Sequence, residues 1–295
     1  MENQDNKLQE DTLLFQHYLI IFLDILGQRR SLRNIRDLPT NETDKADFIR
    51  ALKETIGKVD ALRTLFHTFF VEAKSYQPDI SHVPAQYQQE FISCQQSEAY
   101  FYGFSDSIII AVPLGSNDEN CTAINGVYSA FIAASGISLM ALSGKTALRG
   151  GLDVGIATQI KDKEIYGPAL ERAYYLESNF AEYPRLVVGK ELMSYLHGVE
   201  NQQTRSRSGE VAKSIARFCR EMIIQDTDGF PILDFMGKNA KEVSDNSVDS
   251  DLVKKAGDFV ESQYKKYSSE ENHKLSSRYF RLLRYFKWRA KLWGI

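Results

Sequence analysis

The run HYLIIFLDIL, residues 17–26, constrains the fold of this chain more than any other segment, because it is apolar almost throughout and ends before Gly27. Its isoleucine, leucine and aromatic residues favour a buried strand, and the run is short for a stable helix. Within it lies one acidic residue, Asp24. Burying a carboxylate is costly unless a cation or hydrogen bonds compensate for the lost water. The run therefore predicts a buried strand whose carboxylate lies at an edge of the sheet, where a cation or hydrogen bonds compensate for its burial.

Helix and strand patterns alternate after this run. Apolar residues at helical spacing over 46–74 predict one long helix or two shorter ones, with Thr43 or Asp44 as the N-cap. The patterns that follow predict two strands joined at GFSD, then a helix, then a strand, over 97–114, 121–144 and 148–160. A further helix opens at Gly167-Pro168, since proline suits the first helical turn. The order is βαββαβ, which predicts one α/β domain with helical additions.

Composition narrows the class of protein. With 295 residues, 43% of them hydrophobic, the chain can bury one large core or two smaller ones, and its net charge of -3 gives no overall attraction to nucleic acid or anionic membrane. The three cysteines, Cys94, Cys121 and Cys219, are widely spaced and odd in number, which indicates free thiols in a reducing cytosol. The polar N-terminus lacks the features of a secretory signal, so we expect a cytoplasmic protein without membrane insertion. No GxSxG, metal-binding histidine pair or complete Walker A motif is present.

The last third, residues 201–295, is expected to add a hairpin around Asp228-Gly229 and helices that pack on a core formed by residues 1–200. Its final segment, KLSSRYFRLLRYFKWRAKLWGI, mixes seven Lys and Arg with aromatic residues. Such a helix can bind RNA or a membrane surface. Alternatively, its apolar residues at helical spacing pack on the domain or on a second protomer, and the spacing favours this second interpretation. These apolar residues are Tyr279, Leu282, Leu283, Phe286 and Trp293.

Two aspartates lie at the ends of the predicted strands, one at the first strand and one at the hairpin. Asp24 lies near the end of the first strand and Asp106 lies in the turn of the hairpin, so a sheet that pairs these strands would bring both to one edge. Oxygen ligands of this kind suit Mg²⁺ or Mn²⁺. The alternative is that each aspartate only forms a turn or a cap, a common role for this residue. The presence of both in this order favours a metal site.

These segments resemble a known family. FLDILG and FSDSIIIA resemble the two metal-binding motifs of class III nucleotidyl cyclases, and RGGLDVGIA followed by EIYGPALERAYYLES resembles the later strand, hairpin and helix of that family. The resemblance covers residues 18–190 and implies a ferredoxin-like βαββαβ core. It further implies that Asp24, Ile25 and Asp106 bind two Mn²⁺ or Mg²⁺ ions, that Gly27 lets backbone amides approach the phosphates, and that a homodimer completes the site.

Four positions depart from the pattern of adenylate and guanylate cyclases. Those enzymes carry a lysine four residues before the second metal-binding aspartate, an aspartate three residues before the glycine that opens the late helix, and an asparagine and an arginine on that helix. The residues found here at these positions are Tyr102, Glu164, Glu171 and Tyr175.

Together with GPAL, YPRLVV and DTDGFPILDF, these departures make the chain similar to the pyrimidine cyclases of the Pycsar antiphage defence system. This implies UTP as the substrate and a separate effector that senses the cyclic product. CTP stays an alternative, because Glu164 can accept a hydrogen bond from either pyrimidine. Tyr102 would narrow the base pocket against purines.

An active cyclase without the usual arginine needs another cation to stabilise the transition state. The candidates are Arg149, Arg172 and Arg185, and for each the alternative is a surface arginine or an ion-pair partner. Two other hypotheses stay open. The chain could bind a nucleotide as a regulator without turnover, or it could associate with RNA or membrane through its basic last segment.

Overall fold

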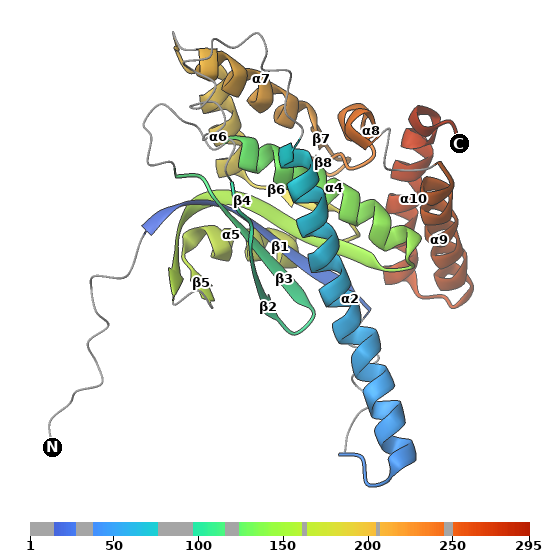
Figure 1. Ribbon diagram of the computed structural model, residues 1–295. Coiled ribbons are helices and arrows are strands. Elements are labelled where there is room, and N and C mark those ends of the chain that lie inside the picture. Colours follow the sequence, from blue (N-terminus) through green and yellow to red (C-terminus); the bar gives the residue numbers. More distant parts are fainter. Residues whose placement is uncertain are drawn as a thin grey trace, which may run out of the picture.

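A computed structural model describes residues 15–27, 38–75, 97–115, 124–160, 164–204, 207–244 and 250–295, which form one sheet flanked by helices (Figure 1). The strands are β1 Phe15–Leu26, β2 Tyr100–Phe104, β3 Ser107–Pro113, β4 Ala147–Ile160, β5 Glu164–Tyr166, β6 Leu186–Val188, β7 Ile223–Gln225 and β8 Pro231–Leu233. The helices are α2 Glu42–Ser75, α4 Ile124–Ser143, α5 Pro168–Asn179, α6 Lys190–Asn201, α7 Arg207–Glu221, α8 Lys238–Ser244, α9 Ser250–Ser269 and α10 His273–Trp293.

The strand order confirms the predicted fold class. The sheet runs β2-β3-β1-β4-β6-β8-β7, with β5 paired to β4 outside this path. Its first four strands belong to a β1-α2-β2-β3-α4-β4 unit, and every neighbouring pair among them is antiparallel. This is the α+β, ferredoxin-like arrangement. Beyond it, β6 pairs parallel to β4, and the β7–β8 hairpin joins the same sheet through Val187 and Ile232.

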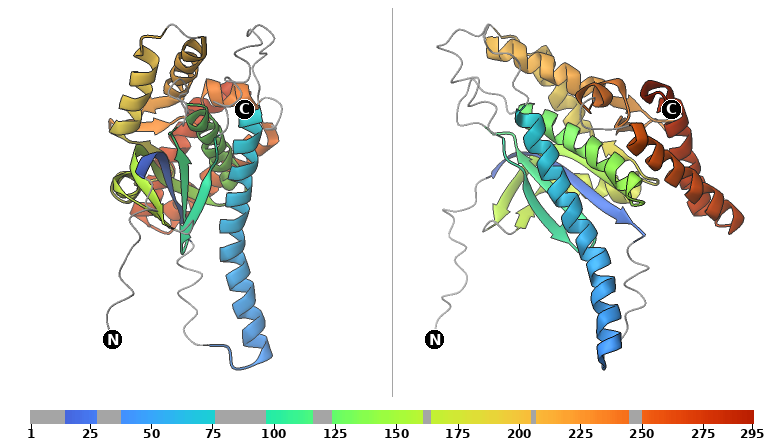
Figure 2. Two further views of the ribbon diagram at one scale, coloured as in Figure 1. Left: turned by 60° about the vertical axis from the view of Figure 1, so that its left-hand side comes forward. Right: turned by 45° about the vertical axis from the view of Figure 1, so that its right-hand side comes forward.

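The side chains of β1 alternate between the two faces of the sheet. Leu19, Ile21, Leu23 and Ile25 are buried in the main core, which α2 and α4 cover. The alternate residues Tyr18, Ile20 and Phe22 belong to a second cluster that includes residues of α5. Figure 2 shows α2 and α4 on one side of the sheet and α5 on the other. Because side chains alternate along a strand, Asp24 follows the second set and lies on the α5 face.

Helix α2 is a single helix of 34 residues, the first of the two forms that the sequence allowed. The predicted cap was wrong. Its first turn is capped by Asn41, whose Oδ1 accepts a hydrogen bond from the backbone N–H of Asp44 at 2.9 Å. Thr43 and Asp44 lie inside the helix. Asparagine is as good an N-cap as aspartate, so residue preference alone could not choose between neighbouring polar positions.

The C-terminal helices pack on the core side of the sheet. Helix α9 contacts α4, and α10 contacts α9 and α8. All five residues predicted to form the apolar face of α10 are buried, which confirms the packing interpretation of that segment. Within the described part of the chain, α4 alone has the length and apolar composition to cross a bilayer, and most of it is buried inside the protein. Burial among α2, α7, α9 and the sheet accounts for that composition.

Candidate active site

Two acidic side chains meet at one end of the central strands. Asp24 of β1 pairs with Ser107 of β3, and Ser107 directly follows Asp106 in the chain. The connection from β2 to β3 is a two-residue turn in which Ser105 adopts a φ of 59°, the left-handed value that such hairpins require at a central position. Both aspartates are buried, with 8% and 7% of their surface exposed. The fold therefore brings two nearly buried carboxylates to the same edge.

Arg149 contacts the first of these carboxylates. It lies opposite Asp24 in the β1–β4 ladder, and its Nε is 3.0 Å from Asp24 Oδ2 and 2.8 Å from Glu177 Oε1. Its Nη1 also donates to the carbonyl oxygen of Ala181 at 3.5 Å. Glu177 of α5 is 3% exposed, so its charge is compensated inside the protein. Asp24, Arg149 and Glu177 thus form a buried triad that joins β1, β4 and α5.

Sequence reasoning missed Glu177, although a signal was present. Ala169, Ala173 and Glu177 are spaced four residues apart and are the buried residues of α5. Residues at this spacing share one face of a helix. A glutamate in register with two buried alanines indicates a charge that needs an internal partner.

Arg172 is bonded to a different acid. Its Nε lies 3.0 Å from Asp153 Oδ2, and its Nη2 donates to the carbonyl oxygen of Val154 at 2.7 Å. Asp153 is 2% exposed and also accepts a hydrogen bond from the backbone N–H of Leu192. Burial raises the pKa of the Asp153 carboxyl, and these hydrogen bonds act in the opposite direction. Arg172 connects α5 to β4 as an ion-pair partner.

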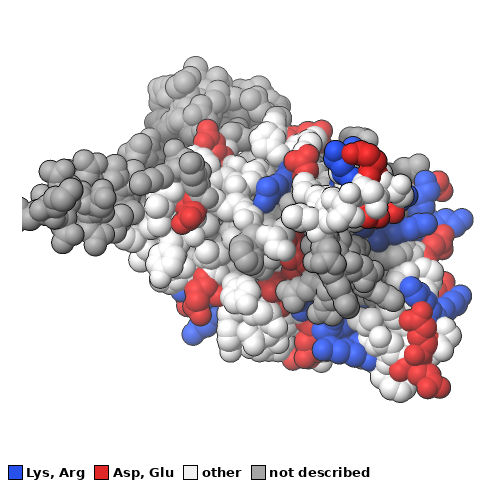
Figure 3. Space-filling model, turned by 90° about the horizontal axis from the view of Figure 1, so that it is seen from below, with Lys and Arg blue, Asp and Glu red and all other residues white. Residues whose placement is uncertain are grey.

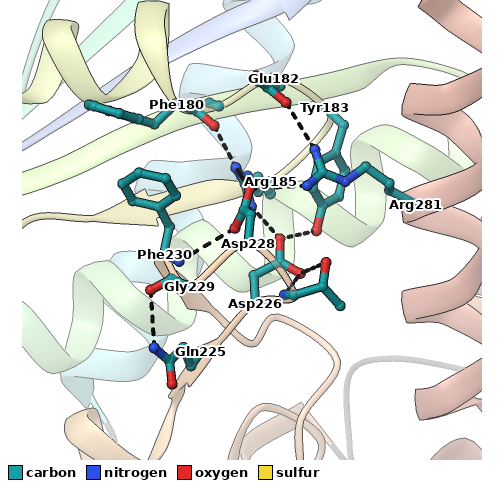
Figure 4. A network of polar contacts seen from close by, with 12 residues as sticks. Phe180, Glu182, Tyr183, Arg185, Gln225, Asp226, Asp228, Gly229, Phe230 and Arg281 are labelled. Atoms are coloured by element: carbon teal, nitrogen blue, oxygen red, sulfur yellow. Dashed lines mark hydrogen bonds and ion pairs between the residues drawn. The ribbon is translucent and has the colours of Figure 1, made fainter.

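Arg185 lies at the centre of a larger polar network, which joins β6, the β7–β8 turn and α10 (Figure 4). The side chain is 3% exposed and binds the carboxylates of Asp226 and Asp228 and the carbonyl oxygen of Phe180. Arg281 of α10 reaches Asp228 Oδ2 at 3.1 Å. The ion-pair alternative therefore describes Arg185, and this network around a buried arginine links the C-terminal helix to the core.

The network makes stability dependent on pH through Asp228. Burial acts to raise the pKa of its carboxyl, but the hydrogen bonds and charge of Arg185 outweigh it, so the net shift is downward. The pKa of this carboxyl is lower in the folded protein than in the unfolded chain, where it is about 4. The ionised carboxylate therefore stabilises the fold above about pH 4, and this stabilisation is lost as the pH falls through the folded-state pKa. Asp228→Asn should therefore cost about 1 kcal/mol at neutral pH, since the carboxylate is partly solvated, and less at about pH 3.

Urea denaturation of the wild type and Asp228→Asn at both pH values measures this difference. Asp258→Asn is the matched control, because Asp258 is exposed on α9. A cost for Asp228→Asn that is the same at both pH values would contradict the assigned role of the carboxylate.

Tyr102 is buried within the β2 strand. It is 7% exposed, belongs to the same cluster as Tyr18, Ile20 and Phe22, and its hydroxyl accepts a hydrogen bond from Gln159 Nε2. Its role in base selection stays a prediction.

The other predicted substrate-binding residues lie on the outer surface of the α5 face. Glu164 begins β5, and Glu171 and Tyr175 lie one turn apart on α5; all three are exposed. The nearby rings of Tyr166 and Tyr174 are exposed by 70% and 53%. The face opposite α2 and α4 therefore carries several solvent-exposed aromatic rings, and Tyr166 lies at the end of the sheet away from Asp24.

Gly27 directly follows β1. It has a φ of 91°, and no atom of the described residues lies within 4 Å of the position where a Cβ would be. The side chain of Ile25 is 1% exposed in the main core, which leaves only its carbonyl oxygen as a ligand. Among the described residues, no three His, Cys, Asp or Glu side chains form a metal-binding group. Two carboxylates with substrate and water oxygens nevertheless fit Mg²⁺ or Mn²⁺, which rarely use an all-protein cage.

Comparisons with known proteins give only distant similarities. No protein-family model and no curated protein matches the chain. The adenylyl cyclase CyaB from P. aeruginosa is 13% identical, with a TM-score of 0.33, over 75% of this chain and 93% of that chain. A class III adenylyl cyclase-like ATP-binding protein from Pseudomonas aeruginosa is 13% identical, with a TM-score of 0.37, over 70% of this chain and 41% of that chain. The fold assignment therefore rests on the strand order and register described above.

Proposed function

We propose that this chain is a class III nucleotidyl cyclase that converts UTP, or alternatively CTP, to the 3′,5′-cyclic nucleotide and pyrophosphate. The observation that carries the proposal is the pair of buried carboxylates, Asp24 and Asp106, at one edge of a βαββαβ sheet. Burial of two acids so close together is unfavourable without cations nearby. Arg149 compensates for part of this charge, and a divalent ion would compensate for the rest.

The reaction is an in-line displacement at phosphorus. The 3′-hydroxyl oxygen forms a bond to the α-phosphorus, the bond from that phosphorus to the bridging oxygen of the β-phosphate breaks, and the hydroxyl proton passes to water. Divalent ions, when bound, would neutralise the triphosphate and activate the hydroxyl. Asp24 and Asp106 would hold these ions, and the backbone at Gly27 would lie against the phosphates.

Arg149 would act as a positioning residue in this scheme. Its Nε holds Oδ2 of Asp24, and in the described part of the chain Oδ1 of Asp24 makes no hydrogen bond. The carboxylate is thereby fixed in orientation with one oxygen left for a cation. Phosphoryl transfer depends mostly on such positioning and on charge neutralisation.

The proposals for the substrate and for the assembly both involve residues outside the main core. Tyr102 in place of a flexible lysine would favour a pyrimidine over a purine, and Glu164, Glu171 and Tyr175 would serve the site of a second copy across a homodimer interface. The exposed rings of Tyr166 and Tyr174 support an interface there, since exposed aromatic residues are enriched at such surfaces. The product would act as a second messenger in antiphage defence, sensed by a separate effector.

Product analysis tests this proposal. The purified wild type is incubated separately with UTP, CTP, ATP and GTP in Mn²⁺, beside Asp106→Ala, and the nucleotides are separated by chromatography. A cyclic pyrimidine nucleotide from the wild type and none from the variant is the expected result. A cyclic purine nucleotide would leave a cyclase but overturn the assignment of Tyr102. No cyclic product, with retained nucleotide binding, would favour the regulator without turnover.

A further inference from the structure

Each of the three candidate arginines already has an ion-pair partner. Arg149 and Arg172 pair with the buried acids Glu177 and Asp153, and Arg185 pairs with Asp226, which is partly buried. Arg278 of α10 differs, because it has no hydrogen bond or ion pair with any described residue. Its guanidinium is therefore available to a ligand.

The packing of α10 brings Arg278 to this end of the molecule. Arg281, three residues later and so on the same side of the helix, binds Glu182 Oε2 at 3.0 Å. Residue 182 directly follows Ala181, whose carbonyl oxygen accepts from Arg149 Nη1. Tyr279 is buried beneath the helix and fixes its rotation. Arg149 and Arg278 thus approach the same short segment, one from the sheet and the other from α10.

The electrostatics agree with this placement. Arg278 is half-buried, and burial together with the positive charge of Arg149 lowers the pKa of its guanidinium, while Glu182 opposes the shift. Neighbouring guanidinium groups repel each other, and an anion bound between them would offset that repulsion. Figure 3 views the molecule from below, the side toward which the β2–β3 turn points; acidic groups are scattered across this face, and Lys and Arg are more frequent toward one end of it.

We propose that Arg278 binds the phosphate groups of the substrate at the edge defined by Asp24 and Arg149. This inference rests on the proposed cyclase function and deepens it, because it assigns to the C-terminal helix the cation that the core lacks at Tyr175. A guanidinium presents its donors in a planar fork that matches phosphate oxygens. It would stabilise the charge that develops on the departing pyrophosphate.

The test compares Arg278→Ala, Arg278→Lys and Arg284→Ala. Arg284 lies on the same helix and is exposed, so its variant controls for the loss of one positive charge from α10. Two quantities are measured in Mn²⁺: kcat and KM for cyclic nucleotide formation, and the affinity for inorganic pyrophosphate by calorimetry. We expect Arg278→Ala to lower kcat by about a hundredfold and to weaken pyrophosphate binding, with Arg284→Ala unchanged and Arg278→Lys intermediate. Melting curves verify that the variants fold.

The two proposals fail in different ways. If the wild type makes a cyclic nucleotide and Arg278→Ala matches Arg284→Ala in both quantities, the inference about Arg278 is overturned and the cyclase stands. A second outcome is that the wild type makes no cyclic nucleotide but binds pyrophosphate, and that only substitution of Arg278 weakens this binding. The phosphate site then stands and the cyclase assignment does not. Equal weakening by Arg278→Ala and Arg284→Ala would show a non-specific charge effect and would overturn the inference.

Discussion

Asp106→Asn is expected to lower the rate of cyclic nucleotide formation by at least about a thousandfold, which corresponds to about 4 kcal/mol of transition-state stabilisation. Asparagine keeps the size of the side chain and one carbonyl oxygen, but it removes the negative charge that would hold a divalent ion in the proposed site. Asp106 lies in the turn between β2 and β3, where asparagine is also a favoured residue. The fold should therefore survive the change.

A steady-state assay of pyrophosphate release at several Mn²⁺ concentrations measures this effect. Asp60→Asn, an exposed substitution on α2, is the matched control and should leave the rate unchanged. The expected signature is a lost rate at unchanged melting temperature, with partial recovery at high Mn²⁺. A rate within tenfold of the wild type would mean that Asp106 does not hold a catalytic ion.

The second large effect concerns stability. Arg149→Ala should lower the free energy of unfolding by about 3–5 kcal/mol, because it leaves Asp24 and Glu177 buried at 8% and 3% exposure without their cation. The loss arises from two carboxylates that face each other across a vacated space. Removing one of those charges should restore part of the stability.

Urea denaturation of Arg149→Ala, Glu177→Gln and the double variant measures this coupling. Adding Glu177→Gln to Arg149→Ala should recover about 1 kcal/mol or more, whereas Glu177→Gln alone should destabilise the wild type. Strictly additive effects would mean that the contact between Arg149 and Glu177 contributes no energy of its own.

Most of the fold could be predicted from local sequence patterns. The apolar strand β1, the Gly-Pro start of α5 and the turn at Asp106 each follow from neighbouring residues, and all three are present where the sequence placed them. Helices α6 and α8 were not predicted. Both are short helices with many polar residues, whose stability comes from packing on the core more than from their own sequence.

The roles of the arginines could not be predicted for a different reason. The acid partners of Arg149 and Arg185 lie far away in the sequence, at Asp24 and in the β7–β8 turn, and only the folded sheet brings them together. From the sequence, Arg278 could not be distinguished from the other Lys and Arg residues of the basic last segment. Once α10 is packed, Arg281 reaches Glu182 and Asp228, whereas Arg278 pairs with no acid among the described residues.

The central place of β1 also affects how the chain is made. β1 lies between β3 and β4, so its long apolar strand has no second neighbour until residue 160 has been synthesised. At a translation rate of about 5–20 residues per second, that interval is on the order of ten seconds. During this time an apolar strand with an open hydrogen-bonding edge is present on the ribosome. We therefore expect nascent chains of this protein to be bound by chaperones that cover exposed apolar segments.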